Sequence, residues 1–294
     1  MIDLLLAVLC SVSIGMIFKH TGRTGIDRTA LLTVNYAAAV GVAALLMGGG
    51  VGTVGGQLSP SPALFGLAGG VGGLLIAGFF LLSYATDVAG MSLAIGVMRV
   101  SVVIPFLASW LVWGEVPSGP QGLGMALAAV AFFLIARKHR SPDAGERGPS
   151  VDGHAFLVLA LTFCAGGSVD LSMKAFEEGF GAQNSRVLFL LLAFGAAFLI
   201  GAVLVVGRGL WRDQWPTGAA LGWGAVLGVV NYGSLEFLLR AVAELPGPFV
   251  FPANNIAIMV LAAALGVAIW DERLTRANQW GLGLAVVALI LLRL

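Results

Sequence analysis

The sequence predicts an all-α integral membrane protein with ten transmembrane helices in two inverted five-helix repeats. Three observations lead to this fold class. Mean hydropathy is +0.96, and charged residues make up 11% of the 294-residue chain, against about 25% in soluble domains. The chain contains ten apolar segments long enough to cross a bilayer. Its second half also repeats its first at a shift of 157 residues, a pattern typical of transporters built from paired repeats.

The ten predicted spans follow one another with short polar interruptions. Spans three and four are separated only by Asp87-Val88, whereas the longest polar run, 137–153, divides the chain into halves. The predicted domains are therefore a first repeat at 1–137, a linker at 138–153 and a second repeat at 154–294. The predicted spans, in order, are 2–18, 29–47, 62–86, 89–113, 119–137, 154–176, 185–207, 217–241, 246–269 and 275–293.

The internal repeat is clearest just before the last span of each half. Trp113-Gly114-Glu115-Val116-Pro117-Ser118 aligns without a gap with Trp270-Asp271-Glu272-Arg273-Leu274-Thr275. The match continues into the span that follows, where Gly124 corresponds to Gly281. The two halves therefore predict two copies of one structural unit.

The odd number of spans in each half predicts that the repeats are inverted. After five crossings, the second repeat enters the membrane from the opposite side, which is the symmetry that permits alternating access. Loops after odd-numbered spans carry eleven Lys and Arg, against four on the opposite side. The positive-inside rule then places the odd-numbered loops in the cytoplasm and both termini outside. The first span lacks a basic n-region and a cleavage site, so we expect a retained helix.

These features resemble the drug/metabolite transporter superfamily, specifically its ten-helix EamA-type members. The resemblance covers the whole chain and rests on the paired repeats and the Trp-Gly-Glu and Trp-Asp-Glu junctions, with Pro105 where the family usually has a proline. It implies a multi-pass carrier of small polar or amphipathic metabolites in a bacterial-type inner (plasma) membrane. Two features depart from the family: Cys10–Gly15 replaces a Trp-Gly-Ser-like signature, and family members usually have both termini in the cytoplasm.

Ionisable residues inside the apolar spans are the main functional candidates. Such a residue costs several kcal/mol unless it faces a cavity or a partner. Arg99 lies near the middle of span four, and its planar guanidinium suits a carboxylate or phosphate on a substrate. Asp170 and Glu236 would balance its charge or carry a coupling proton. The predicted substrate-binding residues are Arg99, Asp170, Asn231, Glu236, Asn254 and Asn255.

Structural alternatives stand beside this predicted site. Asp170 with Lys174 and Glu236 with Arg240 have i,i+4 spacing, which suits local ion pairs whose cations extend toward the interface. Arg99 could instead pair with Glu236 or Asp170 and be released when substrate or a proton arrives. The asparagines suit hydrogen bonds between helices equally well.

Other motif residues are predicted to be structural. Glu115 and Glu272 each precede a span, where a carboxylate suits the positive end of the helix that follows. Ser118 with Gln121 has the spacing of a capping box, and Thr275 with Asn278 forms a looser version. Pro105 and Pro252 are expected to interrupt helical hydrogen bonding within their spans.

The predicted function is secondary transport of a small organic metabolite through a central cavity between the repeats. The solute would be amino acid-like, nucleoside-like or another small polar or amphipathic compound, with a proton or counter-substrate as a second partner. The sequence contains no P-loop, HExxH or GxSxG motif, so we expect neither an enzyme nor a metal or other cofactor. A net charge of +1 gives no basis for nucleic-acid binding. The alternatives are a lipid or lipid-linked-sugar flippase, a membrane enzyme and a non-transporting assembly protein. The protein is expected to be a monomer or a homodimer.

Overall fold

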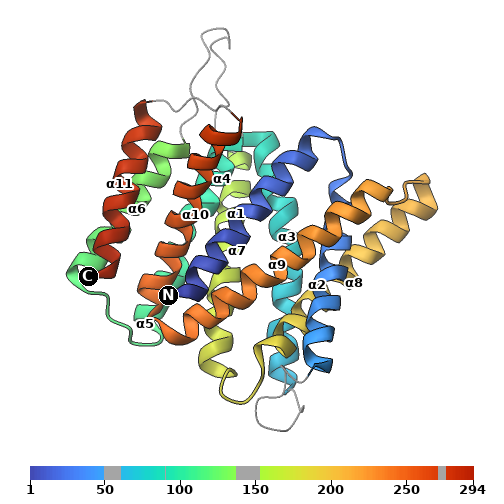
Figure 1. Ribbon diagram of the computed structural model, residues 1–294, viewed down its shortest axis with the longest axis horizontal. Helices are drawn as coiled ribbons and strands as arrows, with labels where there is room; N and C mark the ends of the chain where they lie inside the picture. The colour runs from blue at the N-terminus through green and yellow to red at the C-terminus, as the bar shows by residue number, and fades with distance from the viewer. Residues whose placement is uncertain (50–60, 90, 137–152, 271–275) are drawn as a thin grey trace. The chain divides into compact units, whose positions relative to one another are not determined.

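The computed structural model describes residues 1–49, 61–89, 91–136, 153–270 and 276–294. These residues form helices joined by short connections (Figure 1). This confirms the all-α fold class. Within those ranges the chain forms eleven helices: α1 (Ile2–Arg23), α2 (Arg28–Gly48), α3 (Pro62–Ala89), α4 (Met91–Val100), α5 (Val103–Leu111), α6 (Gly119–Ala136), α7 (Gly153–Gly179), α8 (Arg186–Arg212), α9 (Gly218–Glu244), α10 (Gly247–Trp270) and α11 (Arg276–Arg293).

Many of these helices have the dimensions of membrane spans. Seven of the described helices, α1, α2, α3, α7, α8, α9 and α10, are long and apolar enough to cross a membrane. Two shorter apolar segments cover Val97–Leu111 and Gly119–Leu134. By length and composition, the chain is therefore a multi-pass helical membrane protein, while the count of ten crossings stays a prediction.

Predicted span four is two helices rather than one. Ser101 and Val102 form a turn between α4 and α5. Pro105 explains the position of the break, because it has no N–H to donate and its ring crowds the carbonyl four residues earlier, which belongs to Ser101. That carbonyl accepts a hydrogen bond from the Ile104 N–H instead, at 2.9 Å. Pro252 also lacks an N–H to donate, but α10 continues through it without a break.

The helices form two compact units, and each unit takes residues from both halves of the chain. Unit 1 contains Met1–Ile76 and Ser172–Glu244, and unit 2 contains Ala77–Leu171 and Leu245–Leu294. Long helices α3 and α7 contribute to both units. The compact units thus divide the chain differently from the predicted repeats.

Unit 1 is held together by close helix contacts at glycines. Helix α2 packs against both α8 and α9, and α1 packs against α9. A Cβ atom at Gly228 of α9 would clash with the backbone carbonyl of Asn35 in α2. A Cβ at Gly72 would lie 2.6 Å from the backbone oxygen of Ala193 in α8. Only glycine permits these backbone distances, which is the usual way that membrane helices approach closely.

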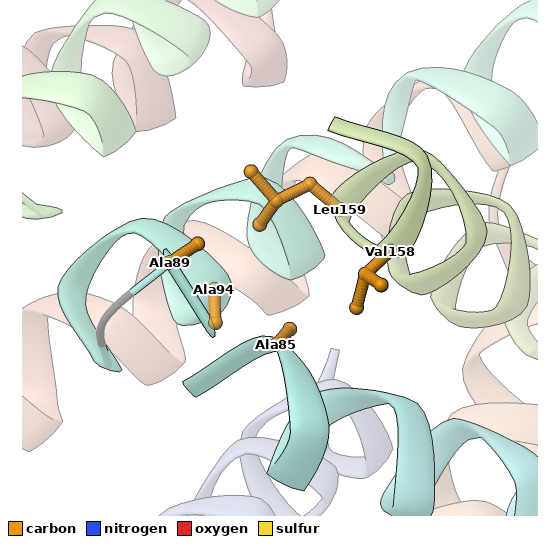
Figure 2. Packing of buried hydrophobic residues seen from close by; sticks show 5 residues of the cluster. All are labelled: Ala85, Ala89, Ala94, Val158 and Leu159. Carbon is orange, nitrogen blue, oxygen red and sulfur yellow. The ribbon is translucent and has the colours of Figure 1, made fainter. Parts of the chain in front are cut away.

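Unit 2 is built around the pairing of α6 with α11, which run side by side (Figure 1), and α10 packs against both and against α5. Gly124 of α6 faces α11, where an added Cβ would lie 3.1 Å from the Ala288 backbone oxygen. An apolar cluster also joins α3 and α4 to α7, which is distant from them in sequence (Figure 2). It consists of Ala85 and Ala89 of α3, Ala94 of α4, and Val158 and Leu159 of α7.

The motif before α6 has the structural role expected of it, and it makes one further contact. Ser118 and Gln121 exchange hydrogen bonds of 3.0 and 3.2 Å, which confirms the capping box. Glu115 also contacts the start of a second helix. Its Oε2 accepts a 2.8 Å hydrogen bond from the Gly247 N–H, at the start of α10. The carboxylate therefore compensates the positive end of α10; Glu272 and Thr275 lie outside the described residues.

We expect Gly228→Ala to destabilise the protein by about 1–3 kcal/mol, because the new methyl group must displace the α2 backbone. Gly222→Ala is the matched control in the same helix, since an added Cβ there meets open space. The control should be neutral or slightly stabilising, because alanine favours helix more than glycine does. Thermal unfolding of both variants in detergent tests this. Equal melting temperatures would contradict the close α2–α9 contact.

We expect Glu115→Ala to destabilise the protein by about 0.5–2 kcal/mol, the range for losing a side-chain cap at a helix N-terminus. Glu115→Gln should recover most of this loss, because its amide oxygen can still accept from the Gly247 N–H. Thermal unfolding of the two variants provides the comparison. A glutamine variant as unstable as the alanine variant would show that the charge, rather than the hydrogen bond, stabilises α10.

Candidate functional site

Three of the predicted site residues come together within unit 2. Arg99 lies in the last turn of α4, and its Nη1 donates a 3.2 Å hydrogen bond to Oδ1 of Asn255 in α10. Asp170 of α7 accepts a hydrogen bond from the Asn255 side chain and interacts electrostatically with Arg99. The cluster therefore joins a cation, an anion and an amide from three helices that are apolar elsewhere.

A close contact between α7 and the α4–α5 break accounts for this meeting. A Cβ atom at Gly166 would lie 2.9 Å from Ser101 Oγ, and one at Gly167 would lie 2.7 Å from the Ser101 backbone oxygen. Asp170 follows Gly167 by less than one helical turn, so the same contact brings its carboxylate toward Arg99. Neither glycine was among the site residues predicted from the sequence. Their signal was an adjacent glycine pair one turn before a carboxylate inside a span.

Two features of the cluster offset the cost of burying the positive charge of Arg99. Asp170 supplies an opposite charge, and the carbonyl end of α4 carries partial negative charge where Arg99 lies. Arg99 and Asp170 are each half-buried, whereas Asn255 is buried. The guanidinium has five N–H donors, and the bond to Asn255 uses one of them. The remaining donors give the cluster the chemistry to bind an anionic group.

Asn254, the next predicted site residue, is buried beside Asn255. Its Oδ1 has no hydrogen-bond partner among the residues that the structure describes. Asn255, by contrast, also donates from Nδ2 to the Phe251 backbone oxygen at 3.1 Å. A buried amide oxygen without a donor is unfavourable by about 1–3 kcal/mol. Asn254 is thus a candidate acceptor for a ligand.

The other two predicted site residues have partners within unit 1. Nδ2 of Asn231 donates to Oδ1 of Asn35 at 3.2 Å, which links α9 to α2. Oε1 of Glu236 accepts from Nη2 and Nε of Arg240, at 2.8 and 2.9 Å. These contacts match the structural alternatives from the sequence: an amide bond between helices and a local i,i+4 ion pair.

Ion pairs near the end of α7 differ from those expected. Lys174 Nζ lies 2.6 Å from Oε1 of Glu178, so its ion pair is directed toward the end of the helix. Asp170 interacts with Arg99 instead. A further ion pair, not predicted from the sequence, joins Glu177 and Arg186, whose Oε2 and Nη2 atoms lie 3.2 Å apart. Both pairs lie at the polar ends of apolar segments.

Comparison with known proteins supports a fold shared over the full length of the chain. No family model matches the sequence. An uncharacterised protein of Haemophilus influenzae is 26% identical over 297 residues, which cover 99% of this chain and 97% of the relative. A solved crystal structure is similar with a TM-score of 0.72 at 16% identity, covering 99% of this chain and 98% of the other. At that identity, the structural similarity shows the fold alone.

Proposed function

We propose that this chain is a secondary transporter that moves a small organic metabolite across a membrane by alternating access. We further propose that it belongs to the EamA-type branch of the drug/metabolite transporter superfamily. The observation that carries the proposal is the cluster of Arg99, Asp170 and Asn255 inside apolar helices. Charged residues at such positions usually mark the path of a substrate or ion.

A purely structural role explains this cluster less well. Replacing a buried ion pair by well-packed apolar residues is often neutral or stabilising, so a charge pair is weak evidence for stability alone. Arg99 also lies directly before a helix break, and broken helices are common at transporter binding sites. A binding role for the guanidinium accounts for both features.

Helix pairings support the proposed inverted repeats, a symmetry that permits alternating access. The contacts α2–α8, α5–α10 and α6–α11 each join helices that occupy equivalent places in the two predicted repeats. The glycine contacts agree with this. Gly72 meets Ala193 and Gly228 meets Asn35, and the two contacts correspond within one residue of the 157-residue shift.

In the proposed mechanism, Arg99 binds a carboxylate or phosphate of the substrate. When substrate is absent, Asp170 neutralises Arg99. When substrate displaces Asp170 from Arg99, Asp170 carries the coupling proton. Asn254 and Asn255 contribute an acceptor and a donor for polar groups of the solute. Glu236, the second proton carrier suggested by the sequence, is less suited to this role because Arg240 already occupies one of its oxygens.

The proposal is tested first by ligand-induced stabilisation. Purified parent, Arg99→Ala and Arg293→Ala proteins are screened against amino acids, nucleosides, sugars, organic acids and amphipathic cations. Arg293 is exposed at the end of α11, so its variant controls for the loss of one arginine. We expect an anionic or zwitterionic solute to raise the melting temperature of the parent and the control only. A ligand at about 100 times its Kd adds about 2.7 kcal/mol.

Transport itself is then measured with that solute in proteoliposomes. Uptake by the parent and Arg293→Ala, with loss in Arg99→Ala, would support the proposal. Stabilisation by lipids alone would favour a flippase. Full uptake by Arg99→Ala would remove the guanidinium from the transport path.

The proposed proton role makes a separate prediction. We expect Asp170→Asn to abolish uptake driven by a pH gradient while it preserves exchange of labelled for unlabelled solute, because the amide cannot take up a proton. Glu178→Gln is the control, since it removes a carboxylate that is exposed near the end of the same helix. If Asp170→Asn proteoliposomes still respond to the gradient, another group carries the proton or no proton is coupled.

A further inference from the structure

A pocket of about 280 Å³ lies in unit 1 where α1 and α8 begin and α9 ends. None of its lining residues belongs to the cluster of Arg99, Asp170 and Asn255. This volume is near the lower end of the range for small-molecule sites. The charged side chains that line the pocket are Asp3, Arg186, Glu236, Arg240 and Glu244.

Negative charge predominates in this pocket because its cations are already paired. Arg240 binds Oε1 of Glu236. Arg186 is paired with Glu177, a residue outside the pocket lining, and is attracted more weakly to Glu236 and Glu244. The pocket lining therefore holds three carboxylates and two guanidinium groups, and Glu177 adds a fourth carboxylate beside Arg186. A ligand that enters this pocket meets excess negative charge.

One of these carboxylates has an unused acceptor. Glu236 is only 6% exposed, and its Oε2 has no hydrogen-bond partner among the described residues. A buried carboxylate oxygen without a donor is unfavourable, and the penalty is larger than for a neutral group. The Tyr232 hydroxyl, one turn earlier on α9, interacts with the same carboxylate. Because Glu236 lines the pocket, a ligand N–H donor would compete with that hydroxyl for this oxygen.

The surroundings favour an organic cation over a metal ion. Within the described ranges, no three His, Cys, Asp or Glu side chains are placed to hold a metal. Val187 and Ala243 add apolar surface to the lining, which suits the alkyl chain of an amine.

We propose that this pocket binds a primary alkylammonium group, with Glu236 Oε2 accepting its hydrogen bond and Asp3 and Glu244 adding negative charge. The ammonium group belongs either to a free amine or to the headgroup of phosphatidylethanolamine. Binding here needs no transport, so this inference and the proposed transport function stand or fall separately.

The test uses n-butylammonium as the probe and thermal unfolding of the full chain in detergent as the measurement. We expect n-butylammonium to raise the melting temperature with dose, while 1-butanol and sodium at equal ionic strength do not. Glu236→Gln should bind the amine roughly tenfold more weakly or worse, since a charge-assisted hydrogen bond is lost. Asp213→Asn removes an exposed carboxylate at the far end of α8 and should behave as the parent. Arg99→Ala should also retain the amine response.

A second variant guards against misfolding of Glu236→Gln. The double substitution Asp3→Asn with Glu244→Gln leaves the Glu236–Arg240 pair intact and should also weaken the response. A matching experiment compares micelles doped with phosphatidylethanolamine or phosphatidylcholine. Stabilisation by the ethanolamine lipid alone would assign the ammonium to a headgroup. No stabilisation by either amine, an equal response to sodium, or an unchanged response in both carboxylate variants would overturn the proposal.

Discussion

The absence of water in a bilayer core governs this structure, because each polar group there needs a partner within the protein. The break between α4 and α5 shows how one such requirement leads to the next. Pro105 prevents a regular bond to the Ser101 carbonyl, and the chain turns so that Ile104 donates to it. Gly167 lets α7 pack directly on that turn. The resulting contact places Asp170 near Arg99, so a proline and a glycine together position a charge pair.

Unit 1 meets the same requirement with small residues and amides. Apolar side chains gain little from leaving lipid for another apolar surface, so membrane helices associate through close packing and hydrogen bonds. Gly228 allows the backbones of α9 and α2 to approach at Asn35. Asn231, one turn further along α9, then reaches the Asn35 side chain. The close packing and the hydrogen bond therefore belong to the same α2–α9 contact. The glycine brings the two helices close enough for the asparagine side chains to reach each other.

The sequence predicts the helices well because long apolar runs between polar residues are a strong signal. Helix ends extend beyond the predicted spans where polar residues continue the helix, as at Arg23 of α1 and Gly179 of α7. Local pairings were also predictable, because Glu236 and Arg240 are neighbours on any helix. The break was not. Pro105 and Pro252 carry the same signal, yet only the segment before Pro105 leaves helical geometry.

The candidate site was also predicted only in part, because spacing along the sequence identifies pairs within a helix but not pairs between helices. The sequence identifies Arg99 and Asp170 as charges that need partners, but helical spacing proposes Lys174 for Asp170, and Lys174 pairs with Glu178. Helix α4 contains no acidic residue, so the partner of Arg99 had to come from another helix, and spacing along the sequence cannot identify it.

A charge pair between two helices differs from a pair within one helix in its response to helix movement. A shift of α7 against α4 would separate Asp170 from Arg99 and leave a guanidinium in an apolar setting, which is unfavourable unless another anion replaces the carboxylate. A substrate carboxylate at Arg99 would supply that anion, so solute binding and helix movement would favour each other.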